Sequence, residues 1–319
     1  MSNELKDYIN EYMPHIDEVL AKKNIPIHKR FILAGTIFIE KAILNSNFKS
    51  NKELLESEIY RECILPLIND WNYEKYGDLA KGNDNIVYTG IVLAYGQPIK
   101  LRIPATTTKI VEEGLLLEIN FPDHLQESEN IEKLIQQKFD LSKMGKESAN
   151  IFESQIRNIV ALTRSINLEL SMASNLSHPS SDMAQGIWNH FEKAISDILT
   201  LKSELASIAC WELHLAIEKS LKVLIHSRSG ISIHGHNLNG LIEFLSKYEQ
   251  EIDSTSLSNL PSDKDAIKLR YAEIIKQPID AFNYYLIALE FVKDMTSRLD
   301  YKINIKNGSI TIKMAPWAK

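Results

Sequence analysis

An arginine and a histidine in the second half of the chain are the first candidates for chemistry. Arg228 and His234 stand six positions apart. An imidazole near a phosphodiester can move protons, and a guanidinium can stabilise the charge that develops on the phosphate. If both side chains converge on one phosphate, Arg228 and His234 would be candidate catalytic residues for a reaction at a phosphodiester. The structural alternative is an ordinary loop histidine.

Histidine is concentrated in the same stretch, where His226, His234 and His236 fall within eleven residues. A His-x-His pair can bind zinc when a third ligand lies near, and His214 or Cys210 could supply it. A loop histidine that contacts the next helix is the more common arrangement. We therefore predict no metal ion at these residues.

A second group of polar residues is predicted to bind a ligand. Glu218 and Lys222 are four positions apart, with the acid first, which is the favourable order on a helix. Charges beside an apolar helix face are costly to leave unpaired. We therefore expect Arg270, Glu218 and Lys222 to form one hydrogen-bonded group with His236 within reach. The alternative is an ordinary surface ion pair.

The remaining cations of interest are Lys100, Arg102 and Lys109, which stand among predicted strands. They form either a small basic patch or a solvated strand face. The sequence contains no glycine-rich phosphate loop, no Ser–His–Asp order and no paired-carboxylate motif above chance. No cofactor is therefore predicted.

The elements that must position these residues are helices. Apolar residues recur at helical spacing in four segments, 184–201, 204–226, 237–248 and 278–299. The second segment is apolar on more than one face, which predicts burial between neighbours. Asn237 is suited to cap the third segment, and Pro278 to begin the fourth.

The end of the chain carries the strongest hairpin signal, Asn307-Gly308. A two-residue turn there would pair Ile305 with Ile310 and align six apolar residues between Tyr301 and Met314 on one face. A lone hairpin is marginal in water, so it must dock on the helices or on another sheet.

The first half mixes two periodicities. Residues 1–80 are predicted to be helical, with a break at Pro66. Residues 85–121 alternate and are rich in β-branched residues, which predicts a small antiparallel sheet of three or four strands. A long helix is expected over 150–174, followed by a polar linker at 175–182.

These patterns predict a mainly α protein that is α+β overall. An α+β domain of unassigned role would occupy 1–176. A helical bundle with a C-terminal β-hairpin would occupy 183–319.

Composition narrows the function further. The chain has 319 residues and a net charge of −6, with 44% hydrophobic and 24% charged residues. Such a composition excludes collagen-like and largely disordered chains. Residues 184–319 are charge-neutral, so neither half has the general basic field that holds nucleic acid by phosphate neutralisation alone.

Two cysteines, Cys63 and Cys210, exclude a disulfide scaffold and suit a reducing compartment. The first residues contain no apolar signal-peptide core, and no apolar run approaches the ~20 residues of a membrane helix. We therefore expect a cytoplasmic protein without a membrane segment.

The second half, over about 185–299, resembles the HEPN family. The residues that carry the resemblance are AIEKSLK at 216–222, HNLNGL at 236–241 and the Arg-Tyr pair at 270–271. The resemblance implies a small helical bundle of the kind found in toxin–antitoxin pairs, antiviral ribonucleases and partners of nucleotidyltransferases.

Ribonuclease members of the family carry an arginine and a later histidine near the last helix, but Gln277–Tyr285 holds neither. The favoured function is therefore a regulatory module of bacterial defence or stress response that binds a nucleotide, RNA or protein. The alternatives are a HEPN endoribonuclease, as a toxin or antiviral effector, and a homodimeric interaction scaffold.

A homodimer built on the second half is also expected. Two helices of this half carry apolar residues on several faces and need more cover than a small bundle supplies, and members of the family usually pair through such faces.

Overall fold

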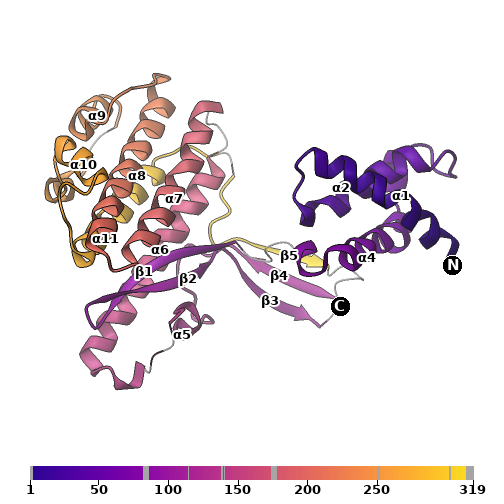
Figure 1. Ribbon diagram of the computed structural model, residues 1–319, viewed down its shortest axis with the longest axis horizontal. Coiled ribbons are helices and arrows are strands. Elements are labelled where there is room, and N and C mark those ends of the chain that lie inside the picture. Colours follow the sequence, from indigo (N-terminus) through magenta and orange to yellow (C-terminus); the bar gives the residue numbers. More distant parts are fainter. Residues whose placement is uncertain are drawn as a thin grey trace. The chain divides into compact units, whose positions relative to one another are not determined.

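A computed structural model describes residues 3–81, 86–113, 115–137, 139, 141–173, 178–249, 252–301 and 303–313. The protein is mainly α-helical with two small antiparallel sheets, so the predicted fold class is confirmed (Figure 1). The chain divides into two compact units. The first comprises Met1–Asn85, Val111–Leu117 and Lys313–Lys319, and the second comprises Ile86–Ile110 and Glu118–Ile312.

Helices make up the N-terminal part of the first unit. Its elements are α1 (Asn3–Lys22), α2 (Ile27–Ala42), α3 (Asn51–Leu55), the π-helix η1 (Tyr60–Ile64), α4 (Leu65–Tyr76) and the 3₁₀-helix η2 (Gly77–Ala80). They enclose a separate apolar core that includes Ile9, Met13, Phe38, Ile39 and Ile68.

The carboxylate of Asp17 ties three of these helices together. It accepts hydrogen bonds from Arg30 Nη1 at 3.2 Å, Lys75 Nζ at 2.7 Å and Tyr76 Oη at 2.5 Å. Burial alone would raise the pKa of Asp17, but the two cations and the hydroxyl hold it below its ordinary value.

The predicted helix break at Pro66 is wrong, because the chain stays helical through it. Proline has no N–H to donate to the preceding turn. The helix adapts by a π turn, in which the N–H of Leu65 donates to the carbonyl of Tyr60. Pro66 then lies in the first turn of α4.

The second unit begins with the antiparallel hairpin of β1 (Val87–Ala94) and β2 (Gln97–Pro104). Tyr95 and Gly96 form its turn, both at positive φ, which is typical of a type I′ turn. The outer edge of β1 is tethered to helix α7 (His178–Ile198). There, one carboxylate oxygen of Glu192 accepts from Thr89 N at 3.0 Å and from Trp188 Nε1 at 2.9 Å.

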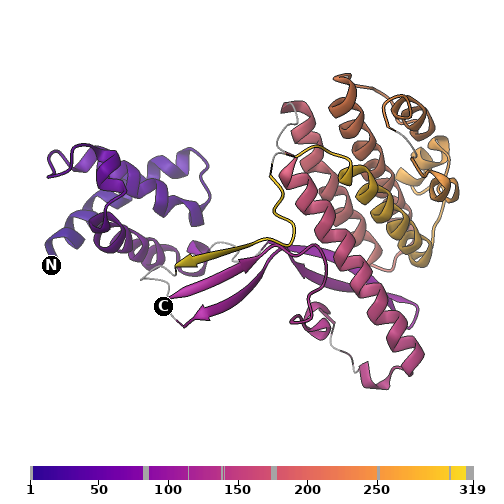
Figure 2. The ribbon, with the colours of Figure 1, turned by 180° about the vertical axis from the view of Figure 1, so that it is seen from behind.

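The other sheet has the order β3 (Thr107–Glu112), β4 (Leu116–Asn120), β5 (Ser309–Lys313). Strand β5 follows helix α11 (Pro278–Ser297) in the sequence and lies beside β4, as Figure 2 shows. The predicted C-terminal hairpin is therefore wrong, because β5 pairs with β4, and the described residues 301 and 303–306 form no strand. Met314 of the predicted pairing lies outside the described residues.

The C-terminal turn falls one residue earlier than predicted. Gly308 N donates to Ile305 O at 3.0 Å, and Asn307 takes a positive φ of 56°. A positive φ at the third position is typical of a type II turn rather than of the type I′ hairpin turn. The strand that follows is thus free to join β4.

A helical bundle forms the rest of the second unit (Figure 1). Its long helices are α6 (Lys146–Met172), α7 (His178–Ile198), α8 (Ser203–Ser229) and α11 (Pro278–Ser297). The short elements are α5 (Ile131–Leu134), η3 (Leu141–Lys143), α9 (Leu238–Leu245), η4 (Thr255–Asn259) and α10 (Asp263–Arg270). Buried side chains of these helices and of β1 and β2 form one apolar cluster.

The compact units do not follow the predicted domains 1–176 and 183–319. The hairpin β1–β2 and helix α6 share their core with α7, α8 and α11, so they belong to the bundle. The predicted linker at 175–182 is helical from His178 onward, and residues 174–177 lie outside the described residues.

Helix α8 packs against α7, α9, α10 and α11 of its own chain. Its buried side chains are covered within one chain, and the homodimer stays a prediction. No described helix combines the length and the apolar character that a membrane span requires.

Candidate functional site

Helix α8 holds the predicted polar group on one of its faces. Trp211, His214, Glu218 and Lys222 follow one another at intervals of three or four residues, so their side chains share a face. His214 is 1% exposed and Glu218 4% exposed. A charge at such a depth requires partners.

Glu218 has two such partners. Its carboxylate accepts from Lys222 Nζ at 2.6 Å and from His236 Nδ1 at 2.8 Å. The Glu218 side chain is 5% exposed, whereas that of His236 is 55% exposed. Since a carboxylate only accepts, Nδ1 carries the hydrogen and Nε2 of His236 faces no described hydrogen-bond partner.

The ring of His236 packs against aromatic residues of α8. The rings of Trp211 and His214 are stacked with centroids 5.8 Å apart and an interplanar angle of 10°. The ring of His236 lies 6.0 Å from that of Trp211. His214 Nε2 lies 3.4 Å from the carbonyl oxygen of His236. One half-exposed imidazole is thus fixed by a buried carboxylate and an aromatic wall.

The loop that carries His236 is shaped at both ends. Gly230 ends α8 at a φ of 70°, and Gly235 has a φ of 104°. Residues with a side chain rarely adopt these positive φ angles, so glycine is required for the course of this loop. Asn237 begins α9, and its side chain accepts from Gly240 N at 2.9 Å, which confirms the predicted cap. We name Glu218, Lys222, His236, Trp211 and His214 the α8 cluster.

A pocket opens two residues beyond His236. It encloses about 560 Å³ and is lined by Leu238, Asn239, Ser254, Thr255, Leu257, Ser258, Leu260, Pro261 and Ser262. No charged side chain is among these lining residues, which offer hydroxyls, one amide and apolar groups. The volume lies within the range of roughly 300–1,000 Å³ typical of small-molecule sites.

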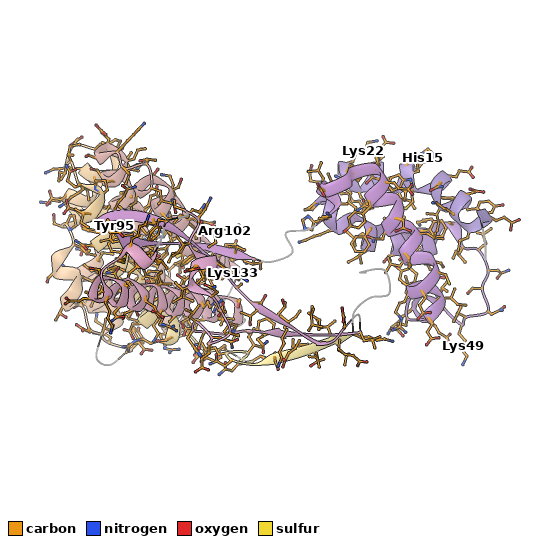
Figure 3. The ribbon with its side chains drawn as sticks, turned by 90° about the horizontal axis from the view of Figure 1, so that it is seen from below. His15, Lys22, Lys49, Tyr95, Arg102 and Lys133 are labelled. Atoms are coloured by element: carbon orange, nitrogen blue, oxygen red, sulfur yellow. The ribbon has the colours of Figure 1, made fainter. Side chains whose placement is uncertain are left out.

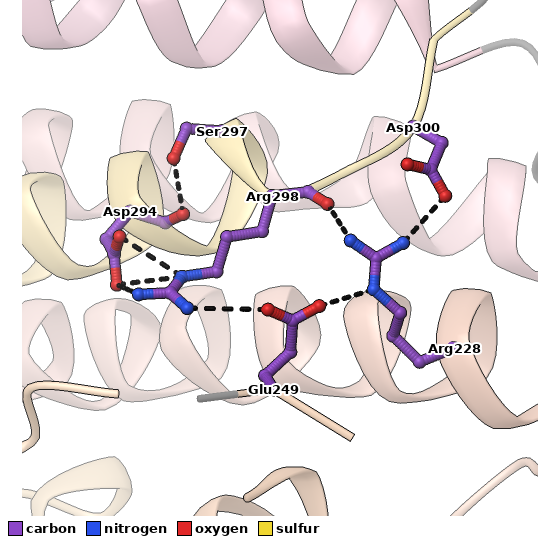
Figure 4. A network of polar contacts seen from close by, with 6 residues as sticks. All are labelled: Arg228, Glu249, Asp294, Ser297, Arg298 and Asp300. Atoms are coloured by element: carbon purple, nitrogen blue, oxygen red, sulfur yellow. Dashed lines mark hydrogen bonds and ion pairs between the residues drawn. The ribbon is translucent and has the colours of Figure 1, made fainter. Parts of the chain in front are cut away.

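Arg228 belongs to a different group, drawn in Figure 4. Its guanidinium donates to Glu249, to Asp300 Oδ2 at 2.7 Å and to the carbonyl of Arg298. Arg298 in turn pairs with Asp294 at 3.1 Å and with Glu249 at 3.4 Å. We name these five residues the arginine clasp.

The arginine clasp joins the ends of α8 and α11 to the segment after α9. Burial alone would lower the pKa of Arg228, but its contacts with Glu249 and Asp300 raise it. Arg228 is thus neutralised by two carboxylates, and among the described residues no hydrogen bond connects it to His234. The exposed His234 makes no described hydrogen bond of its own.

The expected membership of Arg270 in the group is wrong. Arg270 lies at the end of α10, is exposed, and packs over the ring of Tyr271 at 5.5 Å. No described hydrogen bond or ion pair joins it to Glu218. The sequence pattern correctly brought Glu218, Lys222 and His236 together, but it could not show which way α10 turns its last residue.

The zinc alternative has no support in the geometry. Across the described ranges, no three His, Cys, Asp or Glu side chains are arranged to hold a metal ion. Cys210 is fully buried, and burial raises the pKa of its thiol to about 12. The thiol is therefore protonated at neutral pH and a poor ligand.

The three cations of the predicted basic patch are divided between the sheets. Lys100 and Arg102 lie on β2, whereas Lys109 lies on β3. The pocket residues Ser254, Thr255 and Ser258 were missed by sequence reasoning, although the run of serines and threonines at 254–258 was a signal for them.

No protein-family model, no curated protein and no solved structure matches this chain.

Proposed function

We propose that the protein is a HEPN-like regulatory module that binds a nucleotide at the α8 cluster and at the pocket that Leu238 and Asn239 line at the start of α9. The observation that carries the proposal is the half-exposed imidazole of His236, fixed through Nδ1 by the buried Glu218, two residues before the pocket begins. An imidazole held in this way can present Nε2–H to a phosphate when it is protonated.

The pocket suits the remainder of such a ligand. Its hydroxyls and the Asn239 amide can hydrogen-bond to ribose and base edges, and Leu257 and Leu260 can contact a base face. Arg228 supports a binding function over cleavage, because its charge is already neutralised in the arginine clasp. The resemblance described above suggests that the module acts in bacterial defence or stress response.

The test is calorimetric titration of the full chain with adenosine, AMP and ATP, and with GMP for base preference. We expect at least one nucleotide to bind, and His236→Ala to weaken binding by roughly tenfold, or about 1.4 kcal/mol. The matched control is His234→Ala, which removes an exposed histidine two residues away and should leave affinity unchanged.

Two outcomes would contradict the proposal. One is the absence of binding by every nucleotide at millimolar concentration, which would favour the interaction scaffold. The other is metal-free cleavage of RNA that His236→Ala abolishes while the fold is retained, which would make the site that of an endoribonuclease.

A further inference from the structure

Helix α1 carries a stripe of exposed residues along one side. Tyr8 is 60% exposed, Tyr12 41% and Val19 47%. His15 lies between them and is also exposed. The spacings of four, three and four residues place these side chains on one helix face. The face is distinct from the one that holds Ile9, Met13 and Leu20 in the core.

Charge is distributed unevenly along the same face. Glu4 and Glu11 lie toward the start of α1, while Lys22 ends the helix and Lys23 follows it. Figure 3 shows His15 and Lys22 on the same side of this unit. Lys22 pairs with Glu18 at 2.8 Å. Glu4, Glu11 and Lys23 have no ion-pair partner among the residues that the structure describes.

We propose that this stripe is an interface at which α1 pairs antiparallel with α1 of a second copy. An antiparallel arrangement centred between residues 13 and 14 sets Tyr8 against Val19 of the second copy, and Tyr12 against its His15. It also sets Glu4 against Lys23. A twofold axis repeats each pair, so one acidic end and one basic end satisfy each other twice.

Charge complementarity favours a second copy of this chain as the partner that binds the stripe of α1. The exposed face of α1 changes from acidic to basic along its length. In an antiparallel pair, the acidic end of each helix therefore lies beside the basic end of the other. The two helix dipoles are then also antiparallel, which is the favourable arrangement. Tyrosine is enriched at protein interfaces, because its ring is apolar and its hydroxyl remains hydrated.

The interface is small. One helix from each copy buries less than the ~1,200 Å² of a standard interface, so we expect a dissociation constant in the micromolar range. Sedimentation velocity of the full chain between ~1 and ~200 µM should therefore show a monomer–dimer equilibrium.

Val19→Glu should weaken the dimer by roughly tenfold or more, since it places a charge against the ring of Tyr8 of the second copy. The matched control is Ile59→Glu, a similarly exposed aliphatic residue of the same unit, at 53%. It should leave the equilibrium unchanged, and Tyr8→Glu should repeat the effect of Val19→Glu.

A charge exchange tests the orientation. Glu4→Lys and Lys23→Glu should each weaken the dimer, and the double variant should restore it, because the opposed charges are then exchanged. A monomer over the whole concentration range would overturn the proposal. So would a dimer that tolerates Val19→Glu and Tyr8→Glu, or a double variant no better than either single one.

Discussion

The buried guanidinium of Arg164 connects several segments of the second unit by hydrogen bonds. Its side chain is fully buried on α6. It donates to both oxygens of Glu129, at 2.7 and 2.8 Å, and to the carbonyls of Pro104 and His124, at 3.0 and 2.7 Å. These hydrogen bonds fix the end of β2 and the segment before α5 to α6.

Arg164→Ala should lower the free energy of unfolding by about 3–5 kcal/mol, since it leaves a buried carboxylate without its partner. The control is Arg157→Ala on the same helix, where the pair with Glu153 is half-exposed and the loss should stay below about 1 kcal/mol. Urea denaturation measures both. Equal losses would show that Glu129 finds another donor.

Asp17 should make the first unit sensitive to acid. Its pKa is held below its ordinary value in the folded state, so its contribution to stability is present at neutral pH and is lost as pH falls through about 4 and below. Asp17→Asn should reduce stability at pH 7 and flatten this acid dependence. Asp70→Asn, which changes an exposed carboxylate on α4, should do neither.

The sequence predicted Glu218, Lys222, His236 and Arg270 as one group. The structure brings the first three together, and helical spacing fixes Glu218 relative to Lys222. His236 joined them through a motif that places it at a helix start. The prediction for Arg270 was wrong because the direction of its side chain depends on how α10 packs on the other helices, which local sequence does not determine. The contacts of Arg228 could not be predicted, because its partners Glu249 and Asp300 are distant in sequence.

At the scale of elements, β5 depends on a buried carboxylate of the bundle. Glu169 on α6 is fully buried and accepts from Thr296 Oγ1 at 2.6 Å and from Lys306 Nζ. Lys306 lies in the turn that leads to β5. The C-terminal strand is thus anchored at its start by a charge pair and along its length by β4.

Lys306→Met should lower the melting temperature, with a loss of roughly 1–3 kcal/mol, because Glu169 loses its cation. Lys313→Met, at the exposed end of β5, is the control and should have little effect. Deletion of residues 301–319 should lower the melting temperature further. An unchanged melt would mean that β5 contributes nothing to stability.

The sequence predicted the starts of helices correctly where a capping residue or a proline marks the first turn. Asn237 caps α9 and Pro278 begins α11, as their residue types indicate. The strand pairing could not be read in this way. Asn307-Gly308 indicates a turn, but the choice of β4 over residues 301–306 depends on Phe121, whose N–H donates to Gly308 O at 3.0 Å.

At the scale of the whole molecule, two apolar cores are separate. Ile39 belongs to the core of the first unit and Leu213 to that of the second, and both are fully buried. Separate cores predict separate unfolding. Calorimetry should resolve two transitions.

Ile39→Ala should move one transition and Leu213→Ala the other, each with a loss of about 2–5 kcal/mol. The two variants serve as controls for each other. A single transition that both variants shift together would show that the units unfold as one.

Glu192 gives the molecule an optical reporter. Its carboxylate holds the indole of Trp188 and the backbone of β1 at once, and the indole also stacks on Phe191 at 5.1 Å and meets Tyr88 at 5.6 Å. When β1 separates from α7, the indole loses its hydrogen bond and enters water in the same event. In a variant in which Trp71, Trp211 and Trp317 are replaced by Phe, the red shift of the emission of Trp188 would therefore report the detachment of the hairpin from the bundle.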